Sequence, residues 1–440
     1  MKSAAVNFIL NKGNRKTHCK MRLNTNFLNQ RTFLKGNFLI LIITWILMYS
    51  TQPIPSTYES LYFLNLGADT FLLSVIGFAG SLTIALVQIP GGYLADQHGR
   101  RWLTVTMTFG LAAGYVFFIL APSWQFIILG MTLQSLCLIY QPALMAMMLD
   151  SVTPEKRGIG FNFQSVLLNF VALPAPLIAA ALVLVNGEYV SPQSDLGMRV
   201  AYTVVFAAYV AAAVLRLRLK ETFPVNNAHE RPRILQAFRE YPRCFRECWR
   251  VWSQIPKSAS YLFVSMVSIN GVVAGCQIFF VVYAKEVLGI TGLQWAIVMA
   301  FMYLSIALPA LLAGFRMDVT GRKGFLVLGF LLYVPAMLLF VNADFTLLLV
   351  AFFLFGLGNM LRVNSSQALL GDLIPREVRG KASGFLQFFL FFTQAFVYLL
   401  IGFLYSYVAP QLPFVLLSAI AVPIAMLVVL KVKDPSIKEV

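Results

Sequence analysis

The chain has 440 residues, of which 59% are hydrophobic and only 12% are charged. This composition excludes an ordinary soluble protein, because a soluble core of this length cannot bury so much apolar surface, and it indicates a chain surrounded by lipid. The formal net charge of +16 would suit a nucleic-acid partner, but the placement of the basic residues along the chain, given below, excludes one.

Residues 1–36 are polar and basic and contain no acidic residue. No short apolar segment with a small-residue cleavage site precedes the first apolar run, so we expect no cleaved secretory signal. An organelle transit peptide is the alternative for an Arg-rich start without acids. The many Asn residues and the apolar run that follows directly favour a cytoplasmic N-terminal tail instead.

Twelve apolar runs follow, most of them near or above the roughly 20 residues that a helix needs to cross ~30 Å of hydrocarbon. Several are too long to be strands, and a membrane barrel would show alternating segments of ~10 residues. The sequence therefore predicts an all-α membrane protein with twelve transmembrane helices. The runs are Phe38–Leu64, Thr70–Leu94, Trp102–Ala121, Trp124–Leu149, Ile159–Val185, Val200–Leu215, Ala259–Ala284, Leu293–Phe315, Phe325–Val341, Phe345–Leu370, Ala382–Tyr407 and Leu412–Leu430.

The basic residues are distributed unevenly between the two sides of these runs. With both chain ends on one side, all but three of the 34 Lys and Arg residues fall on that side. The exceptions are Arg199, Lys285 and Arg362. Such an excess is typical of cytoplasmic loops and not of a surface that binds nucleic acid. We therefore predict that both termini and the central loop are cytoplasmic, in a plasma or inner membrane.

The central segment, residues 216–258, separates the first six runs from the last six. It carries apolar residues at helical spacing among several arginines, a pattern that suits an amphipathic helix on the anionic cytoplasmic leaflet. The alternative is a linker whose basic residues only fix the topology. The apolar positions are Ile234, Phe238, Tyr241, Phe245, Trp249 and Trp252.

Two short segments occur twice, each time 222 residues apart, as Asp96 and Asp318 illustrate. The first is Gly92-Tyr-Leu-Ala-Asp96-Gln-His-Gly99-Arg100-Arg101, which returns as Gly314-Phe-Arg-Met-Asp318-Val-Thr-Gly321-Arg322-Lys323. The second contains Asp150, Glu155, Arg157 and Gly158, and returns as Asp372, Glu377, Arg379 and Gly380. Such a repeat predicts a duplicated membrane unit, as in many secondary transporters. We expect six-helix bundles at residues 37–215 and 259–430, followed by a cytoplasmic tail at 431–440.

The first of these segments resembles the signature of the major facilitator superfamily of transporters, as do its return and the second pair of segments. The resemblance implies two pseudo-symmetric bundles around a central cavity that is lined by spans one, four, seven and ten. Three residues depart from the family pattern: Gln97, Trp102 and Arg316.

The repeated segments are expected to hold the loops and to gate the cavity. Gly92 would permit close helix approach at the end of span two, and Gly99 would permit a tight turn. The resemblance implies that Asp96 meets the positive N-terminal end of span eleven near Gly380, as a latch between the bundles. The alternative is that these loops only anchor positive charge on one side.

Each bundle is also expected to contain its own ion pair. Arg100 can reach Asp150 in the first, and Arg322 can reach Asp372 in the second. The other predicted signature residues are Arg101, Glu155, Arg157, Asp318, Gly321, Glu377 and Arg379.

Outside the repeated segments, the twelve apolar runs contain one acidic residue, Glu59. It shares a polar face of span one with Gln52 and Ser56, and Pro53 and Pro55 interrupt that helix and free backbone carbonyls. An ionisable residue at membrane depth is costly and generally indicates a pathway for a substrate or an ion, so Glu59 is our candidate for proton coupling. The alternative is a solvated residue near the outer mouth.

Arg362, near the middle of span ten, has two competing roles. We favour the binding of an anionic group of the substrate, and the alternative is an internal counter-ion for Glu59. The other candidate substrate contacts are polar residues of the spans that the resemblance places around the cavity: Gln52, Ser56, Gln134, Gln141, Asn270, Gln277 and Asn359.

Nothing in the sequence predicts an enzyme, a cofactor or a metal site, because the His and Cys residues form no ligand pattern and no nucleophile elbow or phosphate-binding loop is present. We interpret the chain as a monomeric secondary active transporter that moves a small solute by alternating access. An organic anion is the favoured solute and protons are the candidate coupling ion. Two alternatives stay open: an exporter of hydrophobic drug-like compounds, and a membrane sensor or receptor on a transporter fold.

Overall fold

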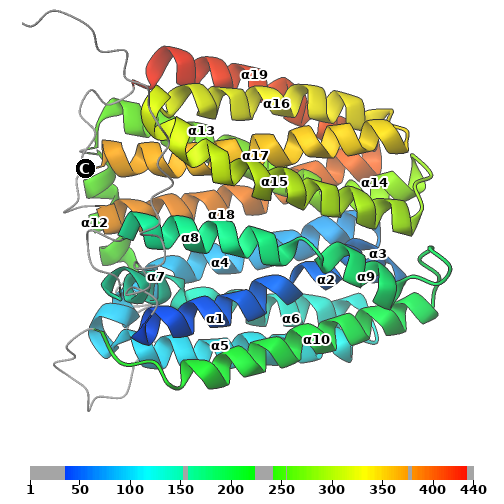
Figure 1. Cartoon of the computed structure of the whole chain (residues 1–440), viewed down its shortest axis with the longest axis horizontal. Coiled ribbons are helices and arrows are strands. Elements are labelled where there is room, and N and C mark those ends of the chain that lie inside the picture. The colour runs from blue at the N-terminus through cyan, green and yellow to red at the C-terminus, as the bar shows by residue number, and fades with distance from the viewer. Residues whose placement is uncertain (1–34, 152–156, 223–240, 254, 375–378, 434–440) are drawn as a thin grey trace, which may run out of the picture.

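The computed structural model describes residues 35–151, 157–222, 241–253, 255–374 and 379–433. Within these residues, 12 helical segments are long and apolar enough to cross a membrane, and they lie where the apolar runs predicted them. The predicted all-α membrane fold with twelve spans is therefore confirmed. Figure 1 shows the helices side by side, with their axes along the long direction of the molecule.

The helices fall into two halves of the chain, which are two six-helix bundles. The first half holds α1 (Gly36–Thr51), α2 (Pro53–Ser56), α3 (Glu59–Asn65), α4 (Thr70–His98), α5 (Arg100–Ile119), α6 (Trp124–Cys137), the 3₁₀ helix η3 (Leu138–Tyr140), α7 (Gln141–Asp150), α8 (Arg157–Ala172), α9 (Ala175–Val183) and α10 (Gln193–Arg216). The central segment contributes α12 (Tyr241–Ser253). The second half holds α13 (Lys257–Gln277), α14 (Phe280–Glu286), α15 (Gly292–Thr320), α16 (Lys323–Val341), α17 (Phe345–Leu373), α18 (Arg379–Phe403), the π-helical turn η5 (Leu404–Val408) and α19 (Leu412–Lys431).

The two ends of the molecule differ in their connections. The repeated segments 92–101 and 314–323 lie at the same end as α12, drawn on the left in Figure 1, and we name it the signature end. The loops 184–192 and 287–291 lie at the other end, which we name the opposite end.

Spans one and seven are broken at corresponding places. In span one, Pro53 and Pro55 follow an interruption at Gln52, between α1 and α2, as expected for residues that have no N–H and crowd the preceding turn. The span breaks again at residues 57–58, between α2 and α3. Span seven breaks at residues 278–279 between α13 and α14, without a proline. Both breaks leave carbonyl oxygens that a continuous helix would have used.

The halves meet mainly along two pairs of spans. One pair is α4 and α18, and the other is α15 with α8 and α9. A Cβ atom added at Gly402 of α18 would lie 1.9 Å from Ser74 Oγ of α4, and one added at Gly77 of α4 would lie 2.9 Å from the ring of Tyr398. The absence of side chains at these two glycines therefore allows α4 and α18 to approach closely.

The central amphipathic helix is present as α12, although Ile234 and Phe238 lie outside the described residues. Its Phe245 ring lies 5.9 Å from the ring of Phe385 and 5.5 Å from that of Phe388, both near the start of α18. The Trp252 ring lies 5.6 Å from Phe385. Part of its aromatic face thus packs on protein, and a contact of α12 with lipid stays a prediction.

Candidate functional site

A cavity of about 320 Å³ lies between the two halves. Its walls come from α2, α3, α4 and α6 of the first half and from α13, α14, α15, α17 and α18 of the second. Three predicted residues line it: Ser56, Glu59 and Gln277. The hydroxyl-bearing residues Thr57 and Ser60 also line it and were not predicted. Both halves therefore contribute polar groups to one cavity.

Glu59 begins α3, directly after the break in span one. The hydroxyl of Tyr202, which is 1% exposed on α10, donates to Glu59 Oε1 over 3.0 Å. The carboxylate of this wall residue thus bonds to a neutral phenol. Sequence reasoning missed Tyr202, because its hydroxyl cannot be distinguished by pattern from those of the other tyrosines.

Hydrogen bonds between the halves close the cavity toward the opposite end. Three of them involve residues next to the breaks in spans one and seven or the start of α15: the Tyr58 hydroxyl donates to the Gly292 carbonyl (2.8 Å), the Trp295 indole N–H to the Thr57 carbonyl (3.0 Å) and the Ser60 hydroxyl to the Ile278 carbonyl (2.6 Å).

Two of the acceptors in this closure stand at helix breaks. Thr57 stands at the break in span one, and Ile278 stands at the break in span seven. A carbonyl at a helix end has lost its regular N–H donor and must find another partner away from water. Each break therefore supplies an oxygen atom that binds the other half.

A second set of contacts lies farther toward the opposite end. The hydroxyl oxygens of Thr70 and Ser406 are 2.6 Å apart, between α4 and the turn after α18. The backbone N–H of Leu293 donates to the Gly187 carbonyl over 3.0 Å. These bonds extend the closure beyond the cavity wall.

At the signature end, both predicted ion pairs are present. Arg100 pairs with Asp150, and Arg322 pairs with Asp372. Gly99 precedes α5 with a φ of +88°, and Gly321 takes the corresponding place with a φ of +97°. Only glycine adopts such angles without strain. The tight turn predicted at Gly99 is confirmed, and it is repeated in the second half.

The close helix approach predicted at Gly92 stays a prediction, whereas its neighbour Gly91 makes such an approach. A Cβ atom added at Gly92 would meet no described atom within 4 Å, whereas one added at Gly91 would lie 2.2 Å from the carbonyl oxygen of Ile139. Adjacent helix residues point about 100° apart. The rotation of α4 therefore turns Gly91, and not Gly92, toward span four.

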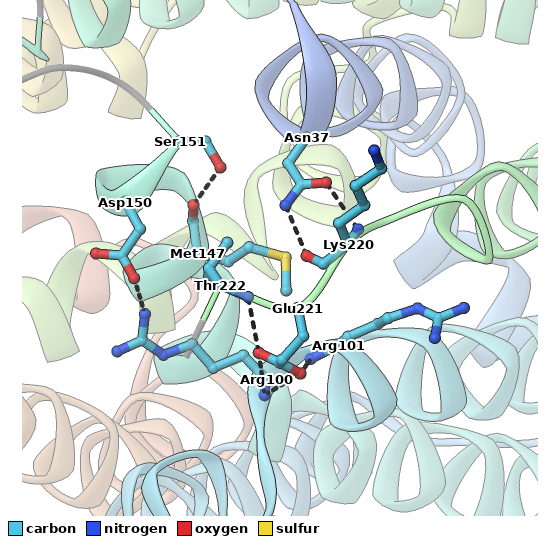
Figure 2. A network of polar contacts seen from close by, with 9 residues as sticks. All are labelled: Asn37, Arg100, Arg101, Met147, Asp150, Ser151, Lys220, Glu221 and Thr222. Carbon is cyan, nitrogen blue, oxygen red and sulfur yellow. Dashed lines mark hydrogen bonds and ion pairs between the residues drawn. The ribbon is translucent and has the colours of Figure 1, made fainter. Parts of the chain in front are cut away.

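A third carboxylate, that of Glu221, joins the signature end of the first half (Figure 2). It accepts hydrogen bonds from the backbone N–H groups of Arg100 (3.1 Å) and Arg101 (2.9 Å), the first residues of α5. The Arg101 guanidinium also donates to the Leu217 carbonyl over 2.9 Å. A carboxylate in this place satisfies N–H groups that the helix leaves open and faces the positive end of its dipole.

We expect Glu221→Ala to lower the stability of the protein by about 1 kcal/mol, as for loss of a helix N-cap. Glu221→Gln should cost less, because its amide oxygen still accepts. The thermal midpoint of the purified protein measures both effects. Glu286→Ala, at an exposed carboxylate of the opposite end, is the matched control. Equal midpoints in Glu221→Ala and the wild type would show that this cap contributes no stability.

Arg362, a residue of α17, is 5% exposed and faces α16. Its Nε donates to the Tyr333 hydroxyl and its Nη2 to Asn359 Oδ1, both over 2.9 Å. The alternative role, a counter-ion for Glu59, is not supported, because Glu59 bonds to Tyr202 and both of these residues lie in the first half. Arg362 is not one of the residues that line the cavity, and its contact with an anionic substrate stays a prediction.

The other candidate substrate contacts bond to protein groups or lie outside the cavity wall. Gln141 accepts from Gln88 over 3.1 Å. Asn270 donates to Gln394 over 3.1 Å, and Gln394 donates across the halves to Ser81 over 3.3 Å. The residues outside the wall are Gln52, Gln134, Gln141, Asn270 and Asn359.

The proposed latch at Asp96 cannot be placed. The side chains of Asp96, Arg157, Asp318 and Arg379, and the whole of Glu155 and Glu377, lie outside the described part of the structure. Their gating roles stay predictions.

Arg216 differs most from its predicted place. We assigned it to the cytoplasmic central loop, but it is the last residue of α10 and is 0% exposed. Its Nε donates to the Thr44 hydroxyl (3.2 Å) and its Nη1 to the Thr108 hydroxyl (2.7 Å). It thereby joins α1, α5 and α10. An arginine at the end of an apolar run gives no sequence signal that separates this role from a loop residue.

Comparisons with known proteins indicate one family. The family model described as Major Facilitator Superfamily matches residues 38–315 and 294–440. The crystal structure of the human organic anion transporter MFSD10 (TETRAN) is similar, with 16% identity and a TM-score of 0.65 over 89% of this chain and 97% of that one. The structure of the peptide transporter POT in complex with sulfate has 15% identity and a TM-score of 0.66, over 89% of this chain and 93% of that one. The structure of the nucleoside transporter NupG has 14% identity and a TM-score of 0.65, over 91% of this chain and 100% of that one. No curated protein sequence matches the chain. At these identities the likeness concerns the fold alone.

Proposed function

Because the chain belongs to the major facilitator superfamily of membrane transporters, we propose that it carries a small solute by alternating access through the cavity between its halves. The observation that supports this most is a cavity of about 320 Å³ that hydrogen bonds between the halves close on one side. When the halves rock, these bonds break and the cavity opens to the opposite end.

The closure has a suitable strength for a two-state transporter. A hydrogen bond between neutral groups contributes about 0.5–1.5 kcal/mol, so the three bonds near the helix breaks together contribute about 3 kcal/mol. A difference of a few kcal/mol keeps one conformer dominant while the other stays accessible. One bound solute can therefore shift the balance.

The signature end, in this proposal, faces the cytoplasm of a plasma or inner membrane. The excess of Lys and Arg in the loops and tails of that end supports this orientation, since such residues are retained on the cytoplasmic side. Both termini are then cytoplasmic, and the structure represents the form that is closed to the outside. The proposed functional unit is one chain.

Protons are the proposed coupling ion, and Glu59 is the group that binds them. Its position in the cavity wall and its neutral partner Tyr202 support this role, because a proton there competes directly with the contents of the cavity.

We expect Glu59→Gln to abolish the pH dependence of transport, since an amide does not titrate near neutral pH. Exchange of solute at equal concentrations, followed in proteoliposomes over the neutral pH range, measures this. The idea of coupling fails if the variant and the wild type respond to pH alike.

Two classes of solute compete for this cavity. An organic anion would need a basic group, and Arg362 lies outside the wall and bonds to Tyr333 and Asn359. A hydrophobic drug-like compound is the other candidate, and the aromatic and methionine side chains of the wall favour it. An organic anion stays a candidate solute, and its binding would depend on Arg362.

A pair of engineered cysteines provides the sharpest test of alternating access. Thr70→Cys with Ser406→Cys places two thiols where the hydroxyl oxygens are now 2.6 Å apart, so oxidation should lock the opposite end shut. A thermal-shift screen first identifies a bound solute. Counterflow of that solute in proteoliposomes should then stop on oxidation and return on reduction. Exchange that continues in the locked protein would contradict the proposal, and binding without any exchange in the wild type would indicate a sensor.

A further inference from the structure

The cavity contains one charged residue, Glu59, among the described residues that line it. Its carboxylate accepts from the neutral hydroxyl of Tyr202. The basic residues that lie away from the signature end donate elsewhere: Arg199 to the Ala121 carbonyl (2.8 Å), Lys285 to the Tyr189 carbonyl (3.4 Å) and Arg362 to Tyr333 and Asn359. When Glu59 is deprotonated, the charge that a solute meets in this wall is therefore negative.

The hydroxyl groups around Glu59 present acceptors to the cavity. Ser56 and Thr57 both donate to the Pro53 carbonyl, over 3.1 and 2.9 Å, and Ser60 donates to the Ile278 carbonyl over 2.6 Å. A hydroxyl has one hydrogen, so each oxygen keeps only its lone pairs for a solute. These hydroxyl hydrogens are already donated within the protein, because the breaks in spans one and seven leave backbone carbonyls that need donors. These acceptor oxygens, with the Glu59 carboxylate, suit a positive group. The other polar groups of the wall include the Gln277 amide and the hydroxyls of Tyr303 and Tyr398.

The rest of the wall is aromatic and polarizable. Its rings are those of Phe63, Phe280, Trp295, Tyr303, Phe355 and Tyr398. Ring faces attract cations, and most strongly where water is excluded. Three methionines, Met131, Met299 and Met302, add flexible apolar surface that adapts to different shapes.

From these observations, and resting on the proposed function as a transporter, we infer that the cavity takes a lipophilic organic cation. The positive centre, an ammonium or phosphonium, lies against the Glu59 carboxylate and the lone pairs of Ser56 and Ser60. Its apolar groups lie against the rings and the methionines. The volume of about 320 Å³ is in the range of small-molecule sites. The inference thus selects the cationic members of the hydrophobic solute class.

Two ions of equal shape and opposite charge test this inference without any mutation. Tetraphenylphosphonium and tetraphenylborate are both measured by equilibrium binding to the purified full-length protein in detergent, with empty micelles as the background. We expect saturable binding of one phosphonium per chain and no saturable binding of the borate. Saturable binding of the borate alone, or of both ions alike, would overturn the inference.

Variants then locate the site. Glu59→Gln is expected to weaken phosphonium binding by at least about 30-fold, as for loss of one partner of a buried charge pair. Glu286→Gln removes an exposed carboxylate outside the cavity wall and is expected to bind within about twofold of the wild type. Equal binding by both variants, with thermal midpoints near the wild type, would also overturn the inference. If neither ion binds but another solute shows counterflow, the cation class is rejected and the transport function stays in place. Absence of exchange for every bound solute would reject the transport function itself.

Discussion

Replacing Gly402 by alanine is expected to stop transport and to open the cavity toward the opposite end. The new Cβ would lie 1.9 Å from Ser74 Oγ and 2.4 Å from Ser74 Cβ. The hydroxyl can rotate away, but the Cβ of Ser74 moves only with α4. Overpacking of this kind costs about 1–3 kcal/mol, which is comparable with the bonds that close this end. The helices α4 and α18 should therefore separate there.

Labelling of one cysteine in the cavity wall, Gln277→Cys, measures this opening in a background without the native cysteines. A membrane-impermeant maleimide is added on the side that the opposite end faces. Its rate of reaction should rise about tenfold or more with Gly402→Ala, because 1.4 kcal/mol is a tenfold change in population. Unchanged labelling and full transport would contradict the assigned role of Gly402.

Two variants make the assignment specific to this contact. Gly384→Ala lies in the same helix, and its Cβ would meet no described atom within 4 Å, so it should behave as the wild type. Ser74→Gly combined with Gly402→Ala removes both the Cβ and the hydroxyl that the new methyl group meets. This double variant should regain the closed end and the transport activity, since the next described contact, with the Phe71 ring, is 3.5 Å away.

Asp372→Asn is expected to destabilise the protein more than Asp150→Asn does, and to remove most of the transport activity. The Asp372 side chain is 11% exposed and that of Asp150 is 39% exposed. Removing one partner of a buried pair costs about 3–5 kcal/mol. A smaller loss is expected at Asp150, because its carboxylate stays in contact with water although its partner Arg100 is only 11% exposed. Arg322, which also donates to the Ala368 carbonyl, would lose its anchor at the turn between α15 and α16.

The thermal midpoint in detergent and counterflow in proteoliposomes compare the two variants. A double variant, Arg322→Met with Asp372→Leu, replaces the pair by apolar side chains of similar size, which often restores stability. If the thermal midpoint of the double variant returns to the wild-type value while transport stays low, the ion pair is needed for the motion of the halves and not only for stability. Equal falls of the midpoint in Asp372→Asn and Asp150→Asn would show that burial does not decide the contribution of these pairs.

The spans and the turns at Gly99 and Gly321 were predictable because they depend on local sequence. The length of an apolar run decides whether a helix can cross a bilayer, and a glycine with positive φ is a property of one residue. The pairs of Arg100 with Asp150 and of Arg322 with Asp372 were predictable because the same spacing occurs twice. Local pattern did not single out Gly91, because the rotation of α4 about its axis decided which of two adjacent glycines met span four.

The candidate site was predictable only in part. Ser56, Glu59 and Gln277 could be selected as polar residues within apolar runs, and they do line the cavity. Arg362 was selected by the same rule, but packing against α16 directs its guanidinium to Tyr333 and Asn359. Arg216 bonds to Thr44 and Thr108, which are 172 and 108 residues away. No sequence period connects residues so distant.

By itself, the amino-acid sequence determined that this protein spans a membrane twelve times, is built from a duplicated unit and carries a transporter signature. These properties follow from hydrophobic length, repetition and charge placement, each of which can be counted along one chain. Only the tertiary structure decided that the breaks in spans one and seven supply acceptors to the other half, and that the cavity pairs one carboxylate with rings and methionines. The physical reason is that a cavity wall belongs to many helices at once, and their rotations and close contacts are set by packing between segments that are distant in sequence.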